Sequence, residues 1–153
     1  MIKTEDYDFI IENIPVVTVD MLIMKDNEIL LLKRNNKPLK NIYYTPGGRV
    51  LKNECLNDAI KRKMKDELSL NFNISEPLGI MEEFFKTPDR HNINVLYYCE
   101  LLEKNDIFIL NDEHSEIKWF DINNTKIHEY VRKKIKIYLE RKKDIAGCII
   151  INN

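Results

Sequence analysis

The chain has few residues of the kinds that cross-link a protein or bend its backbone sharply. Among its 153 residues there are only 3 cysteines, 4 glycines and 5 prolines. The cysteines, Cys55, Cys99 and Cys148, are odd in number and have neither a C-x-x-C spacing nor a partnered histidine. This pattern argues against a zinc site or a redox pair and favours reduced thiols, as in a cytoplasmic protein.

The chain also lacks a charge imbalance and a long hydrophobic run. Its 24 basic and 25 acidic residues leave a formal charge of −1, which gives no reason to expect nucleic acid or a membrane as a partner. No apolar run approaches the roughly 20 residues that span a bilayer, and residues 1–8 are acidic where a signal peptide is basic. We therefore expect one cytoplasmic domain over residues 1–153.

Apolar patterning predicts strands on both sides of a helix. Residues 16–24 and 28–32 are rich in apolar and β-branched side chains and flank the turn signal Asp26-Asn27, which predicts a hairpin. Asp20 interrupts the first of these strands, either as an outward-facing residue or as a site residue. Further predicted strands cover 72–86, 93–102 and 118–120, with a turn at 86–90.

Two segments have helical periodicity. Over residues 54–69, Asn53 is the predicted N-cap and Glu54 lies in the first turn. Residues 126–143 mix apolar residues with basic ones, Lys134 among them, and we expect a solvated basic face, with nucleic-acid binding a distant alternative. This order of elements indicates the α+β class. The apolar stripe of the first helix comprises Leu56, Ala59, Ile60, Met64 and Leu68.

A glycine-rich segment and the helix after it carry the strongest motif. The spacing is G-x5-E-x7-R from Gly48 through Glu54 to Arg62, and it resembles the Nudix hydrolase box, G-x5-E-x7-R-E-U-x-E-E-x-G-U, with U a bulky apolar residue. The resemblance implies the Nudix fold, a mixed β-sheet sandwiched between helices (α/β/α). Three residues depart from the pattern: Lys63 for glutamate, Asp66 for glutamate and Ser69 for glycine.

The departure at Lys63 bears most directly on chemistry. Residues four apart on a helix share a face, so the family's glutamates at the positions of Lys63 and Glu67 bind the same cations. An ammonium cannot ligate Mg²⁺, so we expect one catalytic metal ion. The alternative is that the two residues form an ordinary surface ion pair.

The resemblance extends to one branch of the family, the GDP-mannose mannosyl hydrolases, from about residue 8 to residue 120. Members of this branch also lack the first glutamate, and they are homodimers. For this chain, Phe9, Ile10 and the tail 145–151 are the candidate contact surface. The matching segments surround Asp20, Arg34, Arg49 and Asp112-Glu113-His114, the last of them five residues before Trp119.

Carried over by position, the resemblance implies a Mg²⁺ site, with Mn²⁺ as an alternative, held by Gly47, Glu67 and Glu113. Glu113 replaces an expected glutamine and adds negative charge. Asp66 is either a further ligand or a group that orients a water molecule. Glycine also allows the backbone to approach a ligand closely, because it has no side chain.

The resemblance further implies the substrate contacts and the base. Arg34 and Arg49 would hold the diphosphate with planar guanidinium groups, and Asp20 would face the sugar. His114 would be the general base, since it alone among the three histidines has acids close on both sides. For each of these residues, a purely structural role is the alternative.

The expected reaction is hydrolysis of a nucleotide sugar, GDP-mannose or GDP-glucose, by water attack at the anomeric carbon. Glu82 and Glu83 stand where a glutamine-histidine pair is expected, and Asn94 where a tyrosine is expected, so a related sugar or base stays open. One alternative is a pyrophosphohydrolase that cleaves a P–O bond in a nucleotide sugar or a nucleoside triphosphate. The other is a binding module without turnover.

Overall fold

A computed structural model of the chain describes residues 4–69, 72–86, 89–102, 108, 110–143 and 149–151. Helices and strands alternate irregularly along the sequence, as expected for the α+β class. The elements are α1 (Thr4–Asn13), β1 (Val16–Lys25), β2 (Glu28–Arg34), β3 (Tyr43–Tyr44), β4 (Gly47–Arg49), α2 (Leu56–Leu68), β5 (Phe72–Lys86), β6 (Asp89–Leu101), β7 (His114–Asp121), α3 (Glu129–Lys143) and β8 (Ile149–Ile151).

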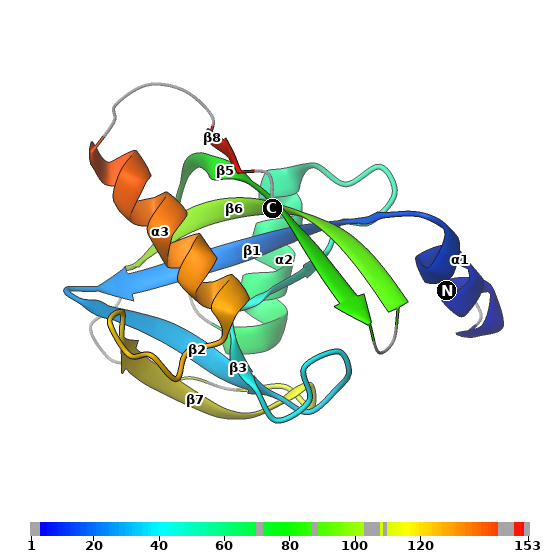
Figure 1. Ribbon diagram of the computed structural model, residues 1–153, viewed down its shortest axis with the longest axis horizontal. Coiled ribbons are helices and arrows are strands. Elements are labelled where there is room, and N and C mark those ends of the chain that lie inside the picture. The colour runs from blue at the N-terminus through cyan, green and yellow to red at the C-terminus, as the bar shows by residue number, and fades with distance from the viewer. Residues whose placement is uncertain are drawn as a thin grey trace.

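The strands form one mixed sheet between α2 and α3 (Figure 1). Its order is β3-β2-β1-β6-β5-β8, with β4 added to β1 and β7 added to β2. The pairs β1·β6 and β5·β8 are parallel, and the others are antiparallel. This architecture confirms the predicted mixed sheet sandwiched between helices.

The sheet splits next to the predicted motif. β1 and β2 pair only at the hairpin end, through Met24 with Ile29 and Lys25 with Glu28. Farther along, β1 pairs with β4, whereas β2 pairs with β3 and β7. The split therefore leaves room between the two halves of the sheet.

Alternation along β1 fills two cores, one on each face of the sheet. Val19, Met21 and Ile23 pack with the buried stripe of α2, whereas Leu22 and Met24 pack with α3. Each fully buried aliphatic side chain contributes about 1.5–3 kcal/mol, so burial on both faces fixes the strand register. Because Asp20 alternates with Leu22, its side chain lies on the α3 side.

The strand predictions hold better in position than in length. The hairpin is confirmed, with Asp26 at a left-handed φ of 54° in its turn. β5 has the predicted bounds, but β6 begins at Asp89 rather than at residue 93, and β7 begins at His114 rather than at residue 118. His114 is thus a strand residue and not part of a preceding loop.

The predicted start of α2 is wrong. Cys55 is the N-cap and makes no side-chain capping bond, and Asn53 lies two residues earlier with φ 65°. Glu54 therefore precedes the helix. At the other end, Ser69 has φ 54° and donates its backbone N–H to the Met64 carbonyl, so a serine adopts the left-handed C-cap conformation that glycine usually supplies.

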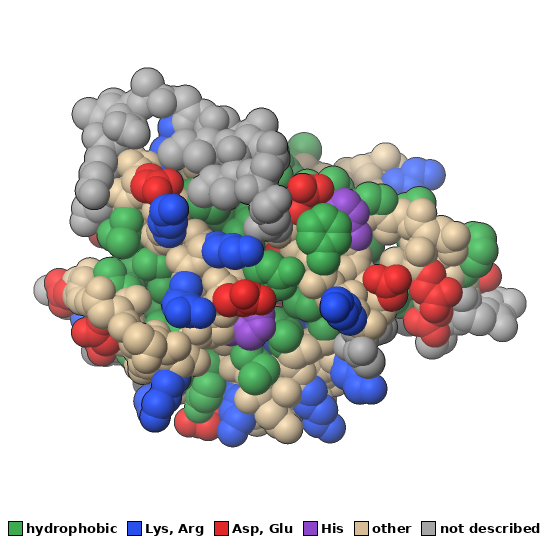
Figure 2. Space-filling view, viewed as in Figure 1, with side chains coloured by type: hydrophobic (Ala, Val, Ile, Leu, Met, Phe, Trp, Pro, Cys, Tyr) green, Lys and Arg blue, Asp and Glu red, His purple; other side chains and the backbone are tan. Residues whose placement is uncertain are grey.

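The predicted basic face of α3 is only partly correct. Basic and acidic side chains are interspersed over the face of the molecule that carries this helix (Figure 2). Lys134, however, is 0% exposed and faces the sheet. α1 was not predicted from the sequence. The helices among the described residues are all too short or too polar to span a bilayer.

The C-terminal tail and the cysteines are described in part. Ile149–Ile151 pairs with β5 as the edge strand β8, whereas the rest of the tail and Cys148 lie outside the described residues. Cys55 is an exposed free thiol and Cys99 a buried one, as predicted for these two residues.

Candidate functional site

A cavity of about 400 Å³ opens where the sheet splits. This volume lies within the range of small-molecule sites. β1, β2, β4, β5, β6 and the last turns of α2 all contribute to its wall, and so does Tyr7 of α1. The predicted site residues that line it are Asp20, Arg34, Gly47, Arg49, Asp66, Glu67 and Glu113.

An ion pair fixes the motif loop onto α2. Glu54 accepts hydrogen bonds from Arg62 Nε at 2.6 Å and Nη2 at 2.8 Å, and from the Leu51 backbone N–H at 2.8 Å. Arg62 also donates to the Arg49 carbonyl at 2.9 Å. The Arg62 contact, followed by the Leu51 N–H, lowers the pKa of Glu54 to about 2. These contacts brace the loop of the motif onto α2.

Close packing explains both glycines of β4. A Cβ at Gly47 would clash with the Val19 carbonyl oxygen and the Asp20 carboxylate, and one at Gly48 would lie 2.8 Å from Lys63 Cε. The Gly47 N–H donates to Glu67 Oε2 at 3.1 Å. The glycines thus let the strand approach both Asp20 and the charged end of α2.

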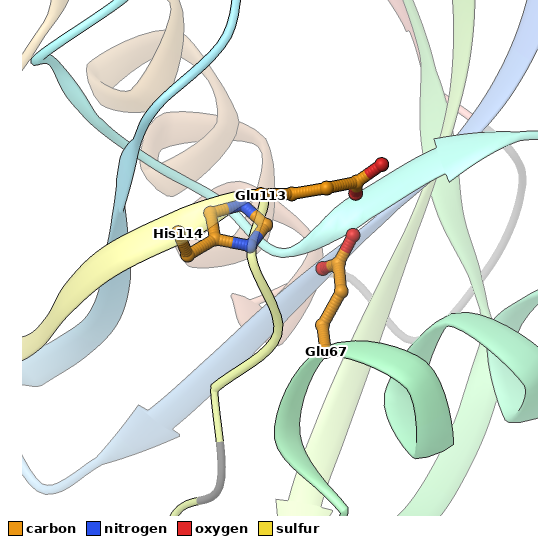
Figure 3. Close-up of side chains that lie close together, drawn as sticks. All are labelled: Glu67, Glu113 and His114. Atoms are coloured by element: carbon orange, nitrogen blue, oxygen red, sulfur yellow. The ribbon is translucent and has the colours of Figure 1, made fainter.

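Glu67, Glu113 and His114 converge at the edge of this cavity. Their potential ligand atoms all lie within 4.8 Å of one another, and Figure 3 shows Glu67 reaching from α2 toward the other two side chains at the start of β7. Glu67 is buried and Glu113 is exposed. Asp66 is exposed and is not a member of this group.

Lys63 lies between the two carboxylates. Its Nζ is 2.6 Å from Glu67 Oε1 and 3.4 Å from Glu113 Oε2, and its side chain is 12% exposed, so this is more than a surface pair. Burial raises the pKa of Glu67 to about 7, although Lys63 opposes the shift. Burial would lower the pKa of Lys63, but the attraction of Glu67 and Glu113 outweighs it and raises that pKa.

The donor set fits a hard divalent cation. Carboxylate oxygens are the ligands that Mg²⁺ prefers, and a buried carboxylate with a raised pKa gains from any cation placed beside it. One ammonium offsets only one of the two negative charges. Glu67 and Glu113 are therefore the residues that would hold the ion. A metal ion would compete with Lys63 for the same carboxylate oxygens. The lysine therefore limits how much positive charge this centre can take up from metal ions.

His114 is 8% exposed and does not itself line the cavity, although Glu113 beside it does. Its Nδ1 lies 3.2 Å from Asn111 Oδ1. Burial, and then the nearby Arg34, lowers the pKa of His114 to about 4. The imidazole is consequently neutral near pH 7, the form that accepts a proton, and its lowered pKa makes it a weaker base than an ordinary histidine.

The two predicted phosphate ligands are both on the cavity wall. Arg34 Nε donates to the Pro38 carbonyl at 2.9 Å. The guanidinium carbon of Arg49 lies 4.6 Å from the ring centre of Tyr7, a cation–π contact that the sequence did not reveal because α1 was not predicted.

A second charged centre, which sequence reasoning missed, lies between the sheet and α3. Lys134 Nζ contacts the Asp20 carboxylate and lies 2.8 Å from Glu83 Oε1, and the Tyr44 hydroxyl donates to Glu83. Thr45 also donates to Asp20, at 3.2 Å. Asp20 is thus neither outward-facing nor free, although it does line the cavity.

The charges of this centre depend on one another. Burial raises the pKa of Asp20, and Lys134 offsets the shift only in part. Burial would lower the pKa of Lys134, but Asp20 and Glu83 outweigh it and raise that pKa. The ammonium therefore stays charged between its two partners.

Two signals in the sequence could have revealed this centre. Glu83 alternates with Met81 and Phe85 on β5, and that alternation predicts burial on one face. Lys134 falls three residues after Val131 and four before Tyr138, on the apolar stripe of its helix.

Comparisons with known proteins agree with this architecture. A family model described as the NUDIX domain matches residues 14–140. The chain is 32% identical over 136 residues to the low-salt glycan biosynthesis protein Agl8 of Haloferax volcanii, covering 86% of this chain and 87% of that protein. It is 33% identical over 129 residues to an ADP-ribose pyrophosphatase of Methanocaldococcus jannaschii, covering 84% and 75%.

Solved structures show the same fold. A NUDIX hydrolase from Nitrosomonas europaea superposes with a TM-score of 0.73 at 19% identity, over 89% of this chain and 98% of that one. At this identity the likeness concerns the arrangement of helices and strands.

Proposed function

Because the chain belongs to the NUDIX domain family, whose members hydrolyse substrates with the help of divalent metal ions, we propose that it hydrolyses a nucleotide sugar of the GDP-mannose or GDP-glucose type. Water attacks the anomeric carbon, and GDP and the free sugar are released. The 153 residues act as a single NUDIX domain.

One observation carries this proposal: Lys63 lies between Glu67 and Glu113, beside a neutral His114. A lysine at this position removes one carboxylate from the helix that would otherwise collect several metal ions. A centre with a single ion suits a hydrolysis in which the diphosphate is the leaving group and is not itself attacked. A neutral imidazole suits the removal of a proton from water.

The residues on the cavity wall divide the remaining work. Glu67, Glu113 and the Gly47 carbonyl would hold one Mg²⁺ or Mn²⁺ ion, which would supply positive charge to the departing diphosphate. Arg34 and Arg49 bind the diphosphate oxygens through paired N–H donors and stabilise the charge that builds up on them.

In the reaction itself His114 takes a proton from the attacking water. The water oxygen bonds to the anomeric carbon with inversion, and the bond from that carbon to the phosphate oxygen breaks. Its electron pair leaves with GDP. Glu113 lines the cavity and adjoins His114, so the water approaches the imidazole past this carboxylate. Asp20, held by Lys134, accepts a hydrogen bond from a sugar hydroxyl.

The similarity to an ADP-ribose pyrophosphatase favours a second candidate, P–O cleavage of a nucleotide sugar or nucleoside triphosphate. The similarity to a glycan biosynthesis protein supports a sugar-containing substrate in either case. The two reactions differ in their products, because P–O cleavage within the diphosphate releases a nucleoside monophosphate.

Product analysis separates these candidates. The protein with Mg²⁺ is incubated with GDP-mannose, GDP-glucose and ADP-ribose, and the nucleotides are resolved by ion-exchange chromatography. GDP with free hexose is the expected result. GMP or AMP with a sugar phosphate would establish the pyrophosphohydrolase, and no turnover of any substrate would indicate a binding module.

We also propose a homodimer. Phe9 on α1 is 67% exposed, and it lies on the element that also brings Tyr7 to the cavity. Sedimentation of the protein and of Phe9→Ser tests this surface: a dimer that Phe9→Ser dissociates is expected, and a wild-type monomer contradicts it.

A further inference from the structure

Three residues of β6 that line the cavity each carry a buried polar atom without a hydrogen-bond partner. They are Arg90, Asn92 and Asn94, at alternate positions of the strand, and all three line the cavity. Within the described part of the chain, Arg90 Nε, Asn92 Oδ1 and Asn94 Nδ2 are buried and unpaired. Asn92 and Asn94 are only 8% and 1% exposed.

Such atoms are rare in folded proteins, because burying a polar group without a partner costs free energy. Three of them on one strand, all in residues that line one cavity, indicate that a ligand supplies the partners. The catalytic roles assigned above use none of these residues.

The contacts that do exist fix what each residue offers. Thr18 donates its hydroxyl proton to Asn94 Oδ1, so the amide NH₂ of Asn94 remains as a donor. Arg90 Nη2 donates to the Tyr7 hydroxyl at 2.7 Å, which leaves its Nε–H as a donor. Asn92 presents an acceptor between them. Donor, acceptor and donor therefore alternate about 7 Å apart along the strand.

This sequence of donors and acceptors suits a ring with several hydroxyl groups, because each hydroxyl both donates and accepts. The charge nearby points the same way. Asn92 lies opposite Glu83 in the sheet, and the centre formed by Asp20, Glu83 and Lys134 has two carboxylates for one ammonium. A phosphate is disfavoured there, whereas an uncharged sugar is not.

We propose that Asn92 and Asn94, with Arg90 at the end of the row, form a strip that binds the hydroxyl groups of the glycosyl ring and sets the preference among sugars. The strip rests on the proposed function, since it assumes a nucleotide-sugar substrate. Arg49, a proposed phosphate ligand, belongs to β4, which pairs with β1 on the side opposite to β6.

Calorimetry with GDP-mannose and with GDP, both in Mg²⁺ and all in proteins that also carry His114→Gln to slow hydrolysis, tests the strip through binding alone. Asn92→Leu and Asn94→Leu keep the side-chain size and remove the hydrogen-bonding atoms. Each is expected to weaken GDP-mannose binding about tenfold and to change GDP binding less than about twofold. Asn73→Leu, at an exposed position of β5, is the matched control and should change neither affinity.

A deoxy analogue gives a second readout that a structural defect would not imitate. GDP-mannose lacking one sugar hydroxyl should bind the His114→Gln protein about tenfold more weakly than GDP-mannose itself. The ratio of these two dissociation constants should fall toward one in at least one variant. Asn92→Leu keeps the test valid if Asn94→Leu unfolds, because Asn94 also accepts the bond from Thr18.

Equal weakening of GDP and GDP-mannose, or no change in either, would overturn the strip. His114→Gln protein that binds GDP no more weakly than GDP-mannose would do the same. The proposed function fails on a separate readout, the absence of nucleotide-sugar turnover by wild type, so the two failures are distinguishable.

Discussion

The described part of the molecule contains two centres in which one lysine lies between two carboxylates, and they differ in access to water. In the open centre, the side chains of Lys63, Glu67 and Glu113 are 12%, 2% and 54% exposed. In the closed centre, those of Lys134, Asp20 and Glu83 are 0%, 8% and 2% exposed. Similar charges thus occupy two quite different environments.

The difference in exposure decides what each centre does. A fully buried ammonium cannot move away without leaving two buried carboxylates with no cation beside them. Lys134 is therefore a permanent part of the sheet–helix packing. An ammonium at the edge of a cavity shares its carboxylates with water and with cations from solution. The open centre can therefore bind a metal ion, while the closed centre shapes the wall beside it.

The largest expected effect comes from removing the lysine of the closed centre. Lys134→Met leaves Asp20 and Glu83 buried and unpaired, so the free energy of unfolding should fall by about 3–5 kcal/mol. Lys63→Met should cost less, about 1–3 kcal/mol, because it leaves only one buried carboxylate, Glu67, without its cation, while Glu113 stays hydrated. Urea unfolding measures both, with the exposed Lys136→Met as control. Equal losses for Lys134→Met and Lys63→Met would remove the distinction between the centres.

Each centre has a histidine beside it, and only one should matter for turnover. His114→Gln should lower kcat at least about 10²-fold, or about 3 kcal/mol, because the water loses its proton acceptor. His128, whose ring centre lies 5.7 Å from that of Tyr44, belongs to the closed centre. His128→Gln should leave kcat within about twofold.

Nucleotide affinity completes this test. GDP binding should stay nearly unchanged in His114→Gln, since the imidazole acts on water and not on the diphosphate. If GDP affinity and kcat fell in parallel, His114 would be a binding or structural residue and the open centre would lack a base.

Metal affinity should respond to the lysine of the open centre alone. Lys63→Met removes the cation that competes for Glu67 and Glu113, so the Mg²⁺ concentration for half-maximal binding should fall about tenfold. Calorimetry with Mg²⁺ measures the change, and Lys136→Met should leave the affinity at its wild-type value. Weaker Mg²⁺ binding in Lys63→Met would show that Lys63 supports the metal site instead of restricting it.

The smallest effect concerns the ion pair between Glu54 and Arg62, which lies outside both centres. Since the pKa of Glu54 is lowered to about 2 from its ordinary value of 4.5, its ionised form stabilises the fold above pH 4.5, and this contribution is lost as the pH falls toward 2. The Tm of wild type should exceed that of Glu54→Gln at pH 7, and the gap should close by about pH 2. In Arg62→Met the gap between Glu and Gln at position 54 should already be small at pH 7.

Local patterns predicted the parts of the fold that depend on near neighbours. The hairpin of β1 and β2 follows from two apolar runs around Asp26-Asn27, and the buried face of α2 follows from its apolar period. The start of α2 was not predictable in this way, because Cys55 is an unusual N-cap and makes no side-chain capping bond.

The site was predictable only where a motif spans it. The box and the acidic segment before β7 led to Glu67, Glu113 and His114, and the structure brings these three together, although their roles remain predictions. The contact of Lys134 with Asp20 joins residues 114 positions apart. The apolar stripe could have indicated that Lys134 is buried, but no local pattern encodes which residue it pairs with.

Heavy-oxygen water tests the central claim, that attack occurs at carbon and not at phosphorus. Hydrolysis of GDP-mannose in water enriched in ¹⁸O, followed by mass spectrometry of both products, locates the bond that breaks. The label is expected in the free mannose, with GDP unlabelled. Label in a phosphate group would show attack at phosphorus and would contradict the proposed mechanism.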